Sequence, residues 1–140
     1  MSLTLTLIAL HVLAAAFWLG STLFLIGFVS RAIAANPAEG GAFMQRLMLV
    51  SRFPIALAVA GATTILSGFW MFWIVSGGFS RGFMASPTGI LISIGATCGI
   101  AATITGAITG RLRERGGRFA LATASLLVTA LVLMTVGSHI

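Results

Sequence analysis

The first stretch of the chain constrains its fold more than any other, because Leu3–Val29 runs for 27 residues without a formal charge. About 20 apolar residues are enough to cross the hydrocarbon core of a bilayer, since a helix rises about 1.5 Å per residue. Backbone in lipid must satisfy its own hydrogen bonds, so the stretch is predicted to be a transmembrane helix. Its only ionisable side chain is His11.

A polar side chain inside such a helix usually faces a partner or a cavity. On helical spacing, His11 shares a face with Ala14, Ala15, Trp18 and Thr22. The alanines leave room beside the imidazole, where a flat cofactor bound by His11 would fit. Alternatively, His11 hydrogen-bonds a neighbouring helix or lies among lipid headgroups. The pattern does not choose between these interpretations.

The composition excludes a soluble fold, since 59% of the residues are hydrophobic and 7% are charged. A length of 140 residues allows a single transmembrane domain, 1–140. The net charge of +6 comes from eight arginines, no lysine and two acids. Because the arginines lie in short connections, they are expected to orient the protein in a membrane, and no nucleic-acid partner is predicted.

The hydrophobic pattern predicts an all-α membrane protein, an antiparallel bundle of four transmembrane helices. The expected spans are approximately 3–29, 53–75, 88–110 and 119–140. A dense set of helix breakers, Asn36 to Gly41, predicts a turn after the first span. The following segment, 42–50, suits either an interfacial helix or an extension of the second span that bends at Pro54.

Small residues predict where helices approach closely. In the second span they recur every fourth position, and in the third they form two GxxxG pairs. These positions are Ala56, Ala60, Thr64 and Gly68, then Gly95, Gly99, Gly106 and Gly110. The glycines suit packing inside the bundle and equally an intermolecular face in a homo-oligomer. If they pack inside, leucine in place of Gly99 should disrupt the bundle.

Arginines are divided unevenly among the three connections, with three in the first, one in the second and four in the third. The positive-inside rule then places both termini outside the cytoplasm. Counting residues from the cytoplasmic arginines predicts one layer of side chains near the outer membrane face. Its members are His11, His139, Trp70, Trp73, Met71 and Met134.

Histidine and methionine together suit copper or haem iron. We therefore predict that His11 binds a metal or cofactor, with Trp18 beside it. His139 and Met134 are further candidate ligands, although His139, as the penultimate residue, is expected to bind more weakly. Tryptophans at the end of a span, such as Trp70 and Trp73, more often form an interfacial belt.

The segment Leu10–Gly20, LHVLAAAFWLG, resembles the opening helix of the CopD-type copper-resistance membrane proteins. HemJ-type protoporphyrinogen oxidases carry a similar His, Trp and Gly on their first span, and Ser67-Gly68 fits this layout loosely. The resemblance implies a bacterial inner-membrane protein that handles copper or haem b, in which termini outside the cytoplasm would be periplasmic. It implies His11 as ligand, with Trp18 and Gly20 as its packing environment.

The resemblance does not extend to the oxidase activity, because the third span lacks the basic residue that HemJ-type proteins carry there. The chain's two acids, Glu39 and Glu114, both lie in connections, so no paired-carboxylate catalysis and no catalytic residue are predicted. The expected function is haem b or copper binding near the periplasmic face, in metal handling or electron transfer. The alternative is a small structural subunit that packs in a larger respiratory or photosynthetic membrane complex.

Overall fold

The computed structural model describes residues 3–111, 116–137 and 139, and every regular element in these residues is a helix. Four helical stretches are long and apolar enough to cross a membrane, which confirms the predicted all-α membrane fold. They are Leu3–Ala35, Phe53–Val75, Pro87–Ile108 and Ala120–Gly137.

The first membrane-spanning stretch continues beyond its predicted end near Ser30. It consists of α1 (Leu3–Phe24), a π-helical segment η1 (Leu25–Val29) and α2 (Ser30–Ala35), without a break. The Ser30 hydroxyl donates a hydrogen bond to the Ile26 carbonyl, so this serine fits within the helix. Arg31 does not end the helix either. A charged side chain is costly where a helix is surrounded by lipid, but not where the helix extends out of the membrane.

The turn predicted at residues 36–41 is wrong except at Asn36, whose backbone leaves the helical region with φ −142° and ψ 84°. Pro37 opens α3 (Pro37–Leu49), and at that position its missing N–H is not needed. Gly40 lies inside α3, where a Cβ would be 2.7 Å from Cα of Ile33 in α2. This glycine therefore permits close helix packing instead of breaking a helix.

The second span, α4 (Phe53–Val75), has the predicted bounds, and Pro54 lies in its first turn, so it starts the helix instead of bending it. Beyond α4, Gly77, Gly78 and Phe79 follow one another with φ of 60°, 77° and 63°. Phe79 lies against the rings of Phe69, Phe72 and Trp73 at centroid distances of 5.1–5.8 Å. These contacts stabilise a backbone conformation that a non-glycine residue rarely adopts. The short helix α5 (Arg81–Met84) then leads into α6.

Helices α6 (Pro87–Arg111) and α7 (Gly116–Gly137) pack against each other as a pair. The Thr105 and Thr123 hydroxyls lie 2.8 Å apart across this pair. The last span was predicted over 119–140, but α7 begins earlier and ends at Gly137, so His139 lies beyond the helix. Gly137 is a weak helix former that packs close to α6, where a Cβ would be 3.2 Å from Leu91 Cβ.

The GxxxG glycines of α6 do not all face the same neighbour. A Cβ at Gly95 would lie 2.9 Å from Met134 Cγ and 3.3 Å from the Ala130 carbonyl oxygen, so Gly95 lies against α7. A Cβ at Gly99 would meet nothing within 4 Å. Of the two alternatives for these glycines, packing inside the bundle therefore holds for Gly95 but not for Gly99, whose place on an intermolecular face stays a prediction.

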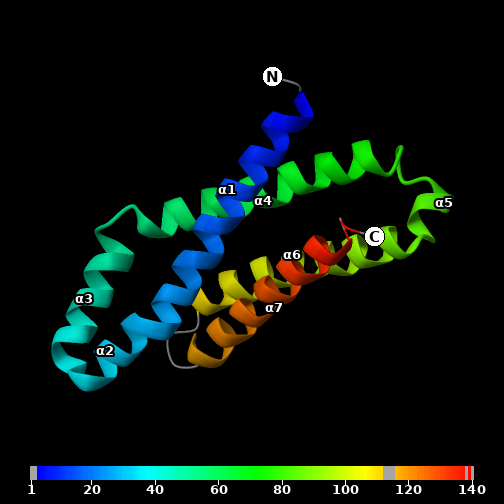
Figure 1. Ribbon diagram of the computed structural model, residues 1–140. Helices are drawn as coiled ribbons and strands as arrows, with labels where there is room; N and C mark the ends of the chain where they lie inside the picture. The colour runs from blue at the N-terminus through cyan, green and yellow to red at the C-terminus, as the bar shows by residue number, and fades with distance from the viewer. Residues whose placement is uncertain (1–2, 112–115, 138, 140) are drawn as a thin grey trace.

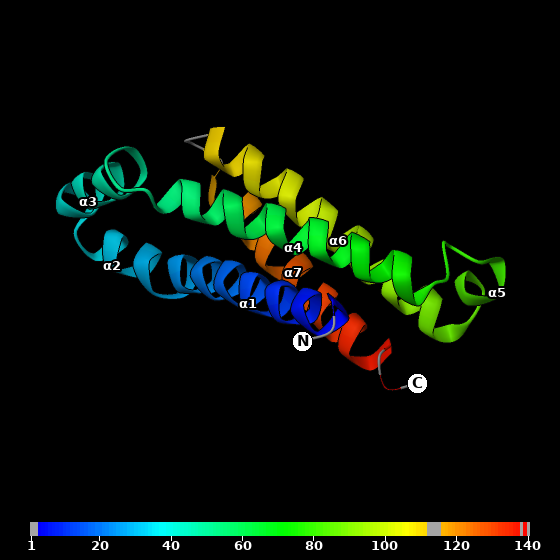
Figure 2. The ribbon, with the colours of Figure 1, turned by 90° about the horizontal axis from the view of Figure 1, so that it is seen from above.

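The four long helices form two pairs, α1 with α4 and α6 with α7, which contact each other less extensively than their members do (Figures 1 and 2). One buried cluster joins them, with one residue from each helix. Its members are Trp18, Ala60, Ala102 and Leu127. Most other large apolar side chains are exposed on the outside of the bundle, as expected for helices in contact with lipid.

Candidate functional site

His11 lies between α1 and α4, where its imidazole hydrogen-bonds the backbone of the neighbouring helix. Its Nδ1 atom lies 2.8 Å from the Thr64 carbonyl oxygen and 3.3 Å from Ser67 Oγ. A carbonyl oxygen only accepts hydrogen bonds, so Nδ1 carries the proton and donates it. The Ser67 hydroxyl donates to the Thr63 carbonyl at 2.5 Å, which leaves its oxygen as a second acceptor for His11.

This hydrogen bond determines which nitrogen of His11 is available to a ligand. When Nδ1 of a neutral imidazole carries the proton, Nε2 holds the lone pair. Histidines that bind metals commonly donate their other N–H to a backbone carbonyl in this way, which fixes the orientation of the ring. His11, which is half-buried, therefore has the tautomer and the support of a metal-ligating histidine.

Gly68 makes this contact possible. A Cβ at this position would lie 2.7 Å from His11 Cε1 and 3.0 Å from Nδ1, closer than real atoms approach. The same Cβ would be 3.8 Å from Nε2, so the ring turns its Nδ1–Cε1 edge toward α4 and Nε2 further from it. Any residue larger than glycine at position 68 would push the imidazole away from the Thr64 carbonyl.

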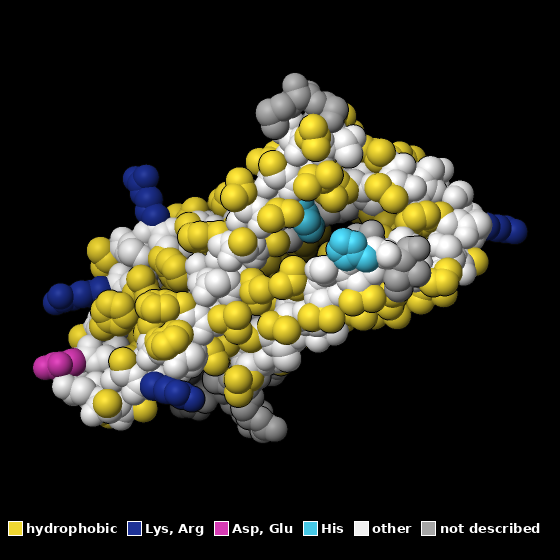
Figure 3. Space-filling model, in the orientation of Figure 1, with side chains coloured by type: hydrophobic (Ala, Val, Ile, Leu, Met, Phe, Trp, Pro, Cys, Tyr) yellow, Lys and Arg dark blue, Asp and Glu magenta, His cyan; other side chains and the backbone are white. Residues whose placement is uncertain are grey.

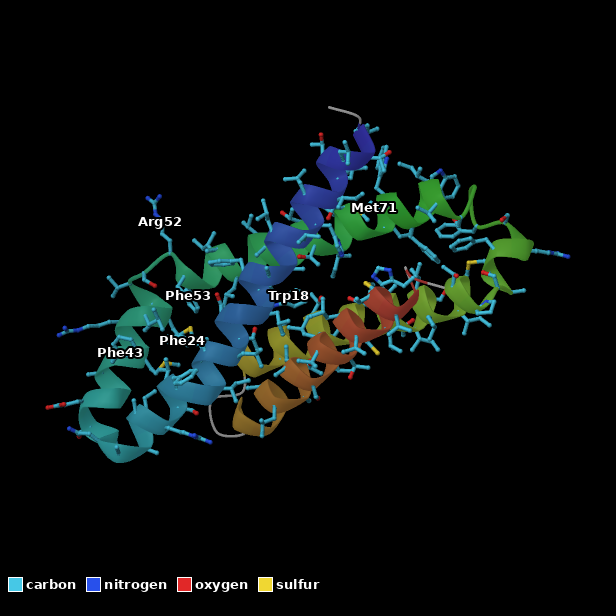
Figure 4. All side chains as sticks on the ribbon, viewed as in Figure 1. Trp18, Phe24, Phe43, Arg52, Phe53 and Met71 are labelled. Atoms are coloured by element: carbon cyan, nitrogen blue, oxygen red, sulfur yellow. The ribbon has the colours of Figure 1, made fainter. Side chains whose placement is uncertain are left out.

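Trp18 shares the α4-facing side of α1 with His11, as the helical spacing predicted. Its side chain is 7% exposed, and its ring lies 3.6–3.7 Å from where a Cβ of Gly61 would be. Figure 4 shows it on the side of α1 that faces the α6–α7 pair. Trp18 is thus a core residue. Helix α4 packs against the rings of both His11 and Trp18, on the side where a flat cofactor was expected to fit.

The imidazole of His11 contacts α4 at Thr64, Ser67 and Gly68, which precede the tryptophans of that helix in the sequence. Its partner Thr64 is the middle residue of α4, 11 residues from either end of Phe53–Val75. Trp70 and Trp73 are six and nine residues further along, or about 9 and 14 Å at the helical rise. Trp70 is only two residues beyond Gly68, which the His11 ring also contacts, so the layer of side chains at one depth stays a prediction.

The other candidate ligands, Met134 and His139, lie in the last part of α7 and just beyond its end. The Met134 side chain lies over Gly95 of α6, and His139 is exposed beyond the end of α7. Figure 3 shows the two histidine side chains on one face of the molecule, beside a hollow. In the described part of the chain, no three His, Cys, Asp or Glu side chains lie close enough together to bind a metal ion.

Sequence reasoning identified His11 but not the group that holds it. The acceptor is a backbone carbonyl, which carries no side-chain signal. Thr64 and Gly68 were singled out only for their small size, as part of the packing stripe of the second span. That stripe was the available signal, because small side chains expose helix carbonyls to a neighbouring helix.

Comparison with known proteins identifies no relative, since no family, curated protein or solved structure matches the chain.

Proposed function

We propose that this membrane protein binds haem b through Nε2 of His11. One observation carries the proposal, the hydrogen bond from Nδ1 to the Thr64 carbonyl oxygen at 2.8 Å. It presents the Nε2 lone pair from a half-buried ring that two partners on α4 hold in place. A ring already ordered by packing loses little freedom when it binds a ligand.

Haem suits these residues better than copper does. Haem iron is held by its four ring nitrogens and needs only one protein imidazole. A copper ion without such a ring needs several protein ligands. The described residues place no three His, Cys, Asp or Glu side chains together, so copper through His11 remains the second form of the proposal.

The residues of the chain would orient and shield the group. His11 would be its ligand, while Thr64 and Ser67 keep the imidazole in one tautomer. The apolar side chains of the surrounding helices would keep water out. Bound haem supplies one-electron redox chemistry, so electron transfer within the membrane is the role we propose. We also propose a bacterial inner membrane, which the resemblance to CopD-type proteins supports, and periplasmic termini, which the arginine count supports.

A second candidate function is a structural subunit of a larger membrane complex. Gly99 favours it, because a Cβ there would meet nothing within 4 Å and part of the GxxxG surface is therefore free. Such a surface suits close contact with a helix of another chain. In this case binding at His11 would not be needed for the function.

The absorption spectrum of the purified protein tests the first proposal. We expect a Soret band in the parent protein, its loss in His11→Gly, and its return when imidazole is added to that variant. His139→Ala is the control and should keep at least most of the band. Copper analysis of the same samples distinguishes the second form of the proposal. Equal absorbance and equal metal content in His11→Gly and the parent would leave the structural subunit as the better explanation.

A further inference from the structure

The hairpin of α2 and α3 lies at one end of the molecule, and the first helix is longer than the hydrocarbon core of a bilayer. The continuous helix Leu3–Ala35 has 33 residues, or about 50 Å at the helical rise. The hydrocarbon core is about 30 Å thick. Figures 1 and 2 show α2 and α3 together at one end of the molecule. This end is therefore long enough to reach the headgroups.

A shallow groove of about 520 Å³ runs along one side of α3, here called the α3 face. It is lined by Phe43, Arg46, Leu47, Val50 and Ser51. Steps of three and four residues place these side chains along one side of the helix. Two of its apolar members are exposed, Phe43 by 52% and Val50 by 80%, while Leu47 is half-buried. An acyl chain would cover this surface better than water does.

The charge at this end of the molecule is positive. Arg46 lines the groove and is exposed, and Figure 4 shows Arg52 projecting outward from the connection between α3 and α4. Figure 3 shows the positive side chains around a hydrophobic surface. The acid of α3, Glu39, is two helical turns before Arg46, about 10 Å along the axis. A molecule that fits the α3 face therefore has an apolar part and a negative charge.

We propose that the α3 face is a binding site for one anionic phospholipid of the surrounding membrane. The phosphate group pairs with the Arg46 guanidinium, and an acyl chain lies along Phe43, Leu47 and Val50. Arginine suits this role because its planar group can donate two hydrogen bonds to a phosphate. The site is separate from His11 and does not depend on haem binding.

A fluorophore near the groove tests the proposal locally. Cys98 is the only cysteine of the chain, so a Cys98→Ala, Leu49→Cys protein can be labelled at one position beside the α3 face. The full-length protein is placed in phosphatidylcholine vesicles that contain a minor fraction of brominated phosphatidylglycerol or, for comparison, brominated phosphatidylcholine. We expect the anionic lipid to quench at about fivefold lower mole fraction, since one arginine near the surface contributes about that factor.

Matched variants separate Arg46 from the overall charge. Arg46→Gln should remove the difference between the two lipids, and Arg46→Lys should keep most of it. Arg81→Gln, at the exposed start of α5, should leave it unchanged. An unchanged preference in Arg46→Gln, or an equal loss in Arg81→Gln, would overturn the proposal. So would removal of the difference by inorganic phosphate at constant ionic strength, since a site for free phosphate would not need the apolar groove.

Discussion

His11 is held by one edge of its ring, through hydrogen bonds to the neighbouring helix, which is one of the interpretations that the sequence left open. The Thr64 carbonyl and the Ser67 hydroxyl both contact Nδ1. The present geometry leaves the Nε2 lone pair for a ligand, and the orientation of that lone pair depends on the absence of a side chain at Gly68.

The residue-scale prediction concerns Gly68→Ala. The new methyl group would lie 2.7 Å from His11 Cε1, so the ring must move away from the Thr64 carbonyl. We expect a loss of stability of about 1–3 kcal/mol, typical of overpacking, together with weaker haem retention. Thermal unfolding in detergent and the Soret absorbance measure the two effects.

Gly20→Ala is the control for this substitution, because a Cβ at Gly20 would meet nothing within 4 Å. It should be neutral or slightly stabilising, as alanine favours a helix over glycine by up to about 1 kcal/mol. If Gly68→Ala behaves like Gly20→Ala in both measurements, the imidazole does not depend on contact with α4.

At this scale the sequence was informative about side chains and silent about the backbone. Helical spacing correctly placed His11 and Trp18 on one side of α1. It could not show that Trp18 would be buried at the junction of four helices, because that depends on the helices packed around it. Nor could it show that a carbonyl would be the partner of His11, because every residue has one.

At the scale of elements, the sequence predicted the bounds of a helix correctly where the effect of a proline or glycine does not depend on a neighbouring helix. Phe53–Val75 was predicted to the residue, with Pro54 in its first turn. The first connection was misjudged because Pro37 and Gly40 are breakers only in the wrong position. Proline at a helix start and glycine at a close contact are both compatible with α3. Which of these applies depends on the neighbouring helix α2.

The element-scale prediction compares two glycines of α6. Gly95→Leu should destabilise the protein by about 1–3 kcal/mol or more, since its Cβ would crowd Met134 and the Ala130 carbonyl of α7. Gly99→Leu should leave the stability of the chain unchanged or raise it slightly, because its Cβ has room and leucine favours a helix.

Thermal unfolding in detergent measures this pair, and size-exclusion chromatography reports the oligomeric state. Equal destabilisation by both leucines would mean that α6 and α7 pack differently from this description. A change of oligomeric state in Gly99→Leu alone would instead indicate that Gly99 contacts another chain.

For the whole molecule, the membrane fold was predictable and the pairing of its helices was not. Long apolar segments identify spans because lipid leaves the backbone few alternatives. Helices that are apolar on nearly all sides, however, carry little information about which neighbour each one takes. The stripe of small residues that includes Ala60 and Thr64 was the available indication that another helix, which proved to be α1, would pack closely against α4.

The whole-molecule prediction concerns orientation. Seven arginines lie in the first and third connections and one in the second, so both termini should face the periplasm. Alkaline phosphatase fused to the C-terminus should be active, and green fluorescent protein at the same position should be dark. The reverse pair of results would place the termini in the cytoplasm and the α3 face on the periplasmic side.

The division into two helix pairs has a consequence for how the protein is made. His11, its acceptors Thr64 and Ser67, and Gly68 all belong to the pair α1–α4. Synthesis proceeds from the N-terminus, so this pair is complete before α6 has been translated. The imidazole can thus form its hydrogen bonds to α4 while the ribosome is still adding the second half of the chain. The later pair, α6–α7, packs against an α1–α4 contact that has already formed, and the haem of the proposed function, if it arrived early, would meet a more open bundle than the finished one.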